Sequence, residues 1–176
     1  NQFLAGGNAT LISSAMLPTL QTYYVDLNET YGSGANVEKA KELMAAAGCP
    51  DGFDLEITVP SNYEYHMQTA EGVVEQLKEA GINAVINPVD WNTWLQDCYT
   101  DRKYQSTICA ITSDMTPGYL MNRFQTESKK NFINFASAAY DETYQKAAAA
   151  MDPEEKAGYY KQLQQILNDE AGSAFI

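Results

Sequence analysis

The chain has 176 residues, 45% of them apolar, which is enough for one buried core and makes a single domain over residues 1–176 the expectation. Its net charge of −12 argues against a nucleic-acid partner, which requires a basic surface, and disfavours an anionic membrane surface. No apolar run is long enough to span a bilayer. Because the chain begins at Asn1 rather than Met, we expect a mature fragment or a trimmed piece of a longer protein.

Residues 1–35 show weak periodicity and many Gly, Asn, Ser and Tyr residues, so they predict an irregular arm with one short helix at most. Asn36 then suits the N-cap of a helix, and Gly48 is placed to end it in a left-handed conformation. One face of this helix carries Val37, Ala40, Leu43 and Ala47.

A strand–helix–strand unit follows. Residues 53–59 alternate between apolar and polar side chains, which predicts a half-buried strand. Met67, Ala70, Val74 and Leu77 recur at helical spacing up to Gly81. Residues 82–89 predict a second strand. Strands joined by a helix in this way run parallel.

A short helix is expected after Asp90, with Trp91, Trp94, Leu95 and Cys98 on its inner face. Residues 107–111 form a continuous apolar run that predicts a strand covered on both faces. Residues 115–136 suggest a short helix and a polar loop. Two helices then close the chain, the first capped by Ser137, with Tyr140, Tyr144, Ala147 and Met151 inward. The second begins at Asp152-Pro153, and its apolar stripe is Ala157, Tyr160, Leu163 or Gln164, and Leu167.

Asp114 stands just beyond the predicted strand 107–111 and before Pro117. In open α/β sheets, ligands bind in the crevice beyond the carboxyl ends of the strands, so this carboxylate is placed to meet a ligand. The structural alternative is an aspartate that caps its own turn.

Catalytic and metal sites have little support. No Ser-His-Asp order, phosphate loop or HExxH motif is present, so we expect no enzyme, no catalytic residue and no cofactor. His66 is the only histidine, and with Glu64 it does not supply enough ligands for a metal site. Cys49, Cys98 and Cys109 lack CxxC spacing and are interpreted as structural or incidental, with a Cys49–Cys98 bridge left open.

The order of these motifs resembles the extracytoplasmic solute-binding proteins of ABC transporters that carry oligopeptides, dipeptides or nickel. The matching segments are Ala40–Leu43, Ala47–Phe53 (AGCPDGF), Gln76–Ile82, Trp91 with Trp94-Leu95, Asp114 with Pro117, and Tyr140-Asp141. They extend over nearly the whole chain, so the resemblance is more specific than a single short motif.

The resemblance implies an α/β fold with a mixed sheet flanked by helices, as in one lobe of a type II periplasmic-binding protein. The chain corresponds to the inserted second lobe, and the first lobe is missing. It implies capture of a small solute, above all a peptide, by hinged closure and delivery to a membrane permease, in the periplasm or at the cell surface as a lipoprotein. Asp114 would receive the ligand ammonium, and Met115, Thr116, Tyr63, Trp91 and Tyr119 would line the crevice.

Two positions depart from the family pattern. Ile111 stands where members carry Trp three residues before the acid, and Tyr104-Gln105 replaces the usual aromatic–aspartate turn. Three alternatives stay open: an oligosaccharide or nickel-complex binder of the same family, a fragment of an enzyme completed by a missing lobe, and an independent interaction module. The small basic group of Arg123, Lys129 and Lys130 is interpreted as a solvated surface.

Overall fold

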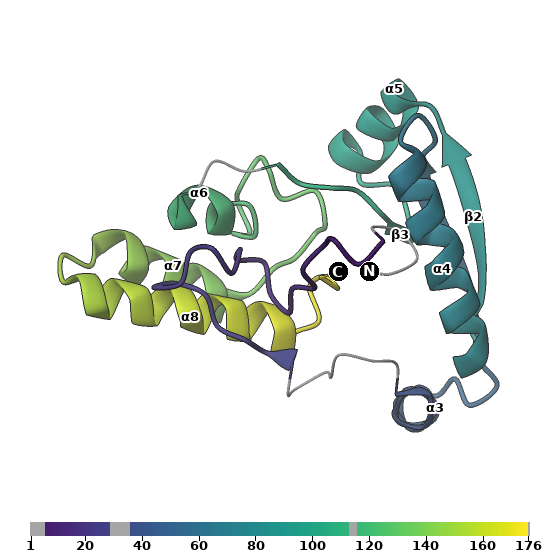
Figure 1. Cartoon of the computed structure of the whole chain (residues 1–176), viewed down its shortest axis with the longest axis horizontal. Coiled ribbons are helices and arrows are strands. Elements are labelled where there is room, and N and C mark those ends of the chain that lie inside the picture. The colour runs from purple at the N-terminus through teal and green to yellow at the C-terminus, as the bar shows by residue number, and fades with distance from the viewer. Residues whose placement is uncertain (1–5, 29–35, 113–115, 176) are drawn as a thin grey trace. The chain divides into compact units, whose positions relative to one another are not determined.

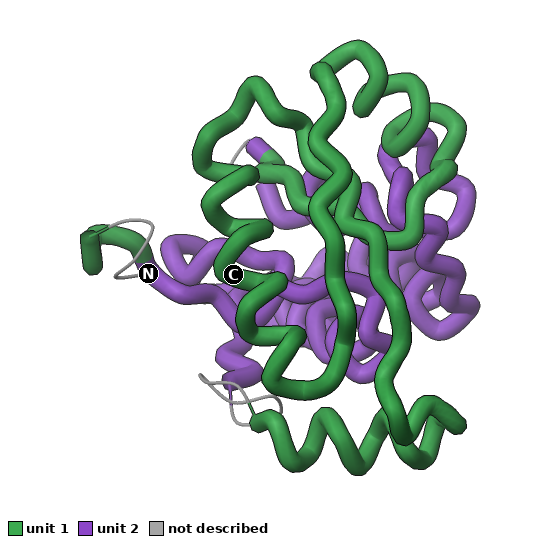
Figure 2. The backbone as a smooth tube through the Cα atoms, turned by 90° about the vertical axis from the view of Figure 1, so that its right-hand side faces the viewer, with its two compact units in different colours: residues 1–9, 32–111 green, residues 10–31, 112–176 purple. Residues whose placement is uncertain are grey.

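The computed structural model describes residues 6–28, 36–112 and 116–175. The chain divides into two compact units, which Figure 2 shows in different colours. Unit 1 comprises Asn1–Ala9 and Gly32–Ile111, and unit 2 comprises Thr10–Tyr31 and Thr112–Ile176. A single domain over the whole chain stays a prediction, and each unit is described by itself.

Unit 1 is an α/β unit with a small parallel sheet. Its elements are α3 (Val37–Ala46), β1 (Asp54–Pro60), α4 (Glu64–Ala80), β2 (Asn83–Val89), α5 (Trp91–Trp94), the π-helix η1 (Leu95–Thr100) and β3 (Ser106–Thr107). The sheet order is β2-β1-β3, and β1 pairs in parallel with both neighbours. The predicted strand–helix–strand unit and the α/β class are therefore confirmed, although the described sheet is wholly parallel rather than mixed.

One face of this sheet packs against α4, which runs alongside β2 in Figure 1. Ile57 and Val59 of β1 are buried there against Ala70 of α4, as the alternating pattern predicts. The opposite face is polar: the Nδ2 of Asn87 donates to the carboxylate of Glu56 at 3.1 Å. Alternation of the β1 side chains thus gives the sheet one apolar and one polar face.

The ends of α3 and α4 follow the predicted chemistry. The Oδ1 of Asn36 accepts the Lys39 N–H at 3.0 Å, and Gly81 ends α4 in the left-handed region with φ of 92°. The apolar face of α3 is not buried, however. Leu43 is 58% exposed, and no residue of α3 is classed as buried.

The third strand is much shorter than predicted. β3 contains only Ser106 and Thr107, and Ala110 and Ile111 are exposed. Hydrogen bonding explains part of this difference, because the Ala110 N–H donates to the Nε2 of His66 at 3.0 Å instead of to a neighbouring strand. The prediction of a strand covered on both faces over residues 107–111 was therefore wrong beyond Thr107.

Unit 2 contains helices α6 (Pro117–Asn122), α7 (Ala138–Ala149) and α8 (Pro153–Asp169). The last two pack side by side (Figure 1). Ser137 and Asp152 cap them as predicted: the Ser137 side chain accepts one backbone N–H and the Asp152 carboxylate accepts two. Met151 is 94% exposed, so its predicted inward position was wrong. The reason is that α7 ends at Ala149 and the backbone becomes extended at Ala150.

The arm of residues 10–28 is irregular, as predicted, yet it is fixed to α8 by one buried side chain. Gln164 is fully buried, and its Oε1 accepts from the hydroxyl of Ser14 at 2.8 Å and the Val25 N–H at 3.3 Å. Its Nε2 donates to the carbonyls of Tyr23 at 2.7 Å and Tyr160 at 2.8 Å. The arm is thereby part of the core of unit 2.

Candidate functional site

Four ring side chains of unit 1 form what we call the aromatic cluster: Tyr63, His66, Trp91 and Trp94. The Tyr63 ring lies 5.4 Å from Trp91, nearly perpendicular to it, and 5.0 Å from His66. The two tryptophan rings are stacked, with centroids 5.1 Å apart and planes 8° apart. Each such ring pair contributes about 0.5–1.5 kcal/mol in addition to the burial of its surface area, so these contacts hold the rings in a fixed arrangement.

Local sequence explains why these rings meet. Tyr63 is the N-cap residue of α4, directly after the turn that ends β1. Trp91 and Trp94 are three residues apart on one helical turn, and Asp90 caps that turn by accepting the N–H groups of Asn92 and Thr93. The loop after β1 and the helix after β2 follow adjacent parallel strands, so both lie at the carboxyl edge of the sheet.

The two tryptophans have different environments. Trp94 is 3% exposed, and its Nε1 donates to the hydroxyl of Thr107 at 2.9 Å. That hydroxyl in turn donates to the carbonyl of Thr58 at 2.6 Å. Trp91 is only partly buried, and Tyr63 is 42% exposed. Trp94 is therefore a core residue, whereas the rings of Trp91 and Tyr63 remain partly exposed.

His66 links this cluster to the segment after β3. Its Nε2 accepts the Ala110 N–H, which requires an unprotonated Nε2 and places the proton of the neutral ring on Nδ1. The Nδ1 atom is buried and has no hydrogen-bond partner in the described parts of the chain. Burial lowers the pKa of His66 below its usual value of 6.5, because the surroundings disfavour the charged ring.

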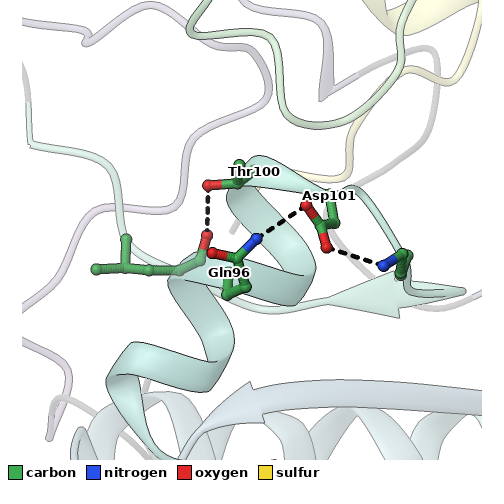
Figure 3. A network of polar contacts seen from close by, with 5 residues as sticks. Gln96, Thr100 and Asp101 are labelled. Atoms are coloured by element: carbon green, nitrogen blue, oxygen red, sulfur yellow. Dashed lines mark hydrogen bonds and ion pairs between the residues drawn. The ribbon is translucent and has the colours of Figure 1, made fainter.

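The π-helix η1 extends the tryptophan helix and is closed by a polar network (Figure 3). The hydroxyl of Thr100 donates to the carbonyl of Leu95 at 2.9 Å, and the Nε2 of Gln96 donates to Asp101 at 2.9 Å. Lys103 donates to the same carboxylate at 2.8 Å and lowers its pKa. These exposed bonds shape the helix end and stabilise it only modestly.

The remaining candidates lie after the unit boundary. Asp114 and Met115 fall outside the described residues. Thr116 is the exposed N-cap residue of α6 in unit 2, and Tyr119 is 40% exposed on the same helix. The structure thus brings Tyr63 and Trp91 together in unit 1 and places Thr116 and Tyr119 on one short helix of unit 2.

One contact was missed by sequence reasoning. The ammonium of Lys130 lies 3.4 Å from the centroid of the Tyr119 ring. The two residues are eleven positions apart, and the second lies in a loop, so no local periodicity signals their contact. The interpretation of Lys130 as a solvated charge therefore overlooked its position over a candidate ligand residue.

The described residues contain no group of three or more His, Cys, Asp or Glu side chains arranged to hold a metal ion. None of Cys49, Cys98 and Cys109 takes part in a disulfide bond. Cys98 is fully buried, and burial raises its pKa, so it behaves as a small apolar side chain. The bridge between Cys49 and Cys98 that was left open is not formed.

Comparison with known proteins decides the family. Residues 1–132 match the model of the bacterial extracellular solute-binding proteins, family 5 Middle. The chain belongs to this family. The family 5 match includes every predicted ligand residue, from Tyr63 to Tyr119, and the resemblance found in the sequence is confirmed.

Individual relatives agree with the family 5 assignment. The dipeptide-binding protein of Escherichia coli (strain K12) is 26% identical over 171 residues, which cover 90% of this chain and 31% of the relative. The dipeptide binding protein of Pseudoalteromonas sp. SM9913, solved with Met-Leu, superposes with a TM-score of 0.87 at 24% identity, covering 99% of this chain and 36% of that one. Haemophilus influenzae OppA, solved with RPPGFSPFR, gives 0.85 at 18% identity and covers 99% and 36%.

The chain spans about a third of the length of these relatives. The structural likeness therefore shows the fold of one portion of a family 5 protein. The relatives are solute-binding proteins rather than enzymes. Within the described parts of the chain, no helix combines the length and apolar character needed to cross a membrane.

Proposed function

We propose that this chain is the ligand-binding second lobe of a solute-binding protein that captures oligopeptides or dipeptides for an ABC importer. The observation that carries the proposal is the family match over residues 1–132, which includes all six predicted ligand residues. Dipeptide- and peptide-binding relatives support peptide as the ligand class. No bond is made or broken in this function.

Each residue has a chemical role in the proposed capture. Asp114 receives the ammonium of the peptide, because a cation taken out of water needs a fixed anion to offset its desolvation. Tyr63 and Trp91 offer ring faces that accept varied side chains. Met115, Thr116 and Tyr119 complete the lining, with the thioether of Met115 as an adaptable apolar contact.

The proposed mechanism is hinged closure onto a first lobe that this chain does not contain. Ligand bound between the two lobes shifts the population towards the closed form, which a membrane permease recognises. The protein would act outside the cytoplasmic membrane, in the periplasm or anchored to the surface as a lipoprotein. The family description supports an extracellular place of action.

Thermal melting of the protein completed by its first lobe tests the proposal. A panel of di- to pentapeptides should include members that raise the melting temperature, since ligand at 100 times its Kd stabilises by about 2.7 kcal/mol. The 176-residue chain alone holds half of the site and should bind the same peptides at least about 100-fold more weakly. No stabilisation by any peptide, or equal affinity of the chain alone, would contradict the proposal.

An oligosaccharide is the second candidate ligand, because the partly exposed ring of Trp91 stacked on Trp94 offers a face on which a sugar ring can lie. Oligosaccharides belong in the same melting experiment, together with Ni²⁺ supplied with a chelator. Stabilisation by a sugar that is unaffected by Asp114→Asn would replace the peptide assignment.

A further inference from the structure

A cation in unit 2 is held in place without being neutralised. Lys130 rests on the face of the Tyr119 ring, 3.4 Å from its centroid. A cation–π contact of this kind contributes about 0.5–1 kcal/mol at a partly exposed site and leaves the positive charge intact. None of the ion pairs within the described residues involves Lys130. The ammonium therefore remains available to an anion.

A second cation lies one helical turn along from the tyrosine. Arg123 follows Tyr119 by four positions and has helical backbone angles at the end of α6, so the two side chains share a face. The Nε of Arg123 is buried and has no hydrogen-bond partner within the described parts of the chain. An unmet buried donor costs about 1–3 kcal/mol, which an incoming acceptor can recover.

Hydrogen bonds fix both segments that carry these residues, helix α6 and the loop that contains Lys130. The carbonyls of Gly118 and Met121 in α6 accept from the hydroxyls of Tyr144 at 3.0 Å and Tyr140 at 2.8 Å. The loop that carries Lys130 is fixed by buried Asn131, whose Nδ2 donates to the carbonyls of residues 125 and 135. Preorganised charges bind an anion with little loss of conformational entropy.

The local charge also favours an anion. The chain as a whole carries −12, yet the stretch from Leu120 to Asn134 holds three cations, Arg123, Lys129 and Lys130, against one acid, Glu127. One further carboxylate reaches this stretch, that of Asp141, which accepts the Thr126 N–H at 3.0 Å. A carboxylate matches this arrangement, because guanidinium groups bind carboxylates through paired N–H donors and an ammonium adds a point charge.

We propose that Tyr119, Arg123 and Lys130 form a carboxylate subsite in unit 2, so that the captured peptide is one that offers a carboxylate to this helix. The subsite rests on the proposed peptide-binding function and adds a substrate class to it. Tyr119 acts as the support that positions Lys130, and Arg123 and Lys130 bind the ligand oxygen atoms.

NMR titration of the 176-residue chain with N-acetylglycine at low salt tests the subsite without the first lobe. We expect saturable shifts at the Tyr119 ring and the Arg123 Nε–H, and none with N-acetylglycinamide, which lacks the charge. Lys130→Gln should weaken binding at least about tenfold, Lys130→Arg should retain it, and the neighbouring Lys129→Gln should leave it unchanged. Absent shifts, or equal effects of the two glutamine variants, would overturn the subsite.

Two further arms identify the ligand and separate the two proposals. Inorganic phosphate binding as tightly as N-acetylglycine would overturn the carboxylate assignment. In the completed protein, Ala-Glu with an amidated C-terminus tests recognition of an acidic side chain, and Ala-Ala tests recognition of a C-terminal carboxylate. If Lys130→Gln weakens the binding of neither dipeptide, the proposed substrate class is overturned. Failure of peptide capture altogether, with N-acetylglycine still bound by the chain, would contradict the function and not the subsite.

Discussion

His66 is the single histidine of the chain, and its position makes the stability of the fold sensitive to the protonation of its ring. Its neutral form accepts the Ala110 N–H, so the fold stabilises the neutral ring over the charged one. The helical spacing of residues 67–77 predicted the helix that carries His66. It could not predict this bond, which joins residues 44 positions apart.

The lowered pKa of His66 predicts a pH-dependent stability. Below pH 6.5, the usual pKa of histidine, His66 binds a proton in the unfolded chain, whereas burial disfavours its protonation in the folded chain. The stability contributed above that pH should be lost as the pH falls through the folded pKa. Urea unfolding between about pH 7.5 and about pH 5.5 should show this loss, and His66→Gln, which keeps an acceptor but does not titrate there, should reduce it. An NMR titration giving a folded pKa of 6.5 or higher would contradict the assignment.

Gln164 should be the most sensitive polar residue of unit 2. Gln164→Glu keeps the acceptor for Ser14 and Val25 but loses the donor to two carbonyls, and it buries a charge. We expect a loss of about 3 kcal/mol in the free energy of unfolding. Gln162→Glu, on the exposed side of the same helix, is the matched control and should change stability by less than about 0.5 kcal/mol. Equal effects of the two variants in urea titrations would refute the role of Gln164.

At the scale of elements, sequence patterns located the helices well and the third strand badly. Caps at Asn36, Asp90, Ser137 and Asp152 are local chemistry, so they could be predicted within one or two residues. The end of β3 depends on side chains from distant elements. The Nε2 of His66 in α4, for example, accepts the Ala110 N–H, and no periodicity in the sequence signals this contact.

Thr107 should contribute more to the stability of unit 1 than Ser106, the other residue of the short strand β3. Its hydroxyl connects the indole of Trp94 to the carbonyl of Thr58, so Thr107→Val keeps the shape and removes both bonds. We expect unit 1 to lose about 2 kcal/mol. Ser106→Ala removes one exposed bond from the same strand and should cost less than about 1 kcal/mol. Tryptophan fluorescence during urea unfolding reports both changes; a neutral Thr107→Val would show that the bridge does not support the tryptophan helix.

At the scale of the whole molecule, the family could be predicted from spaced motifs, because many short segments in a fixed order are specific together. The division into two units could not. The irregular arm of residues 10–28 gave no helical or strand period, yet Met16 in it is fully buried in the core of unit 2. Its place depends on long-range contacts with α8, which leave no local signature.

Capture of the peptide ammonium by Asp114 is the central claim, and calorimetry of the completed protein tests it most directly. A peptide that binds should be compared with its N-acetylated form, for both the natural protein and Asp114→Asn. We predict that N-acetylation of the peptide and the Asp114→Asn substitution each weaken binding at least about 100-fold, or about 2.7 kcal/mol. Both changes together should weaken binding little more than either one alone. Full affinity retained by Asp114→Asn, with the same preference for a free amino group, would contradict the account.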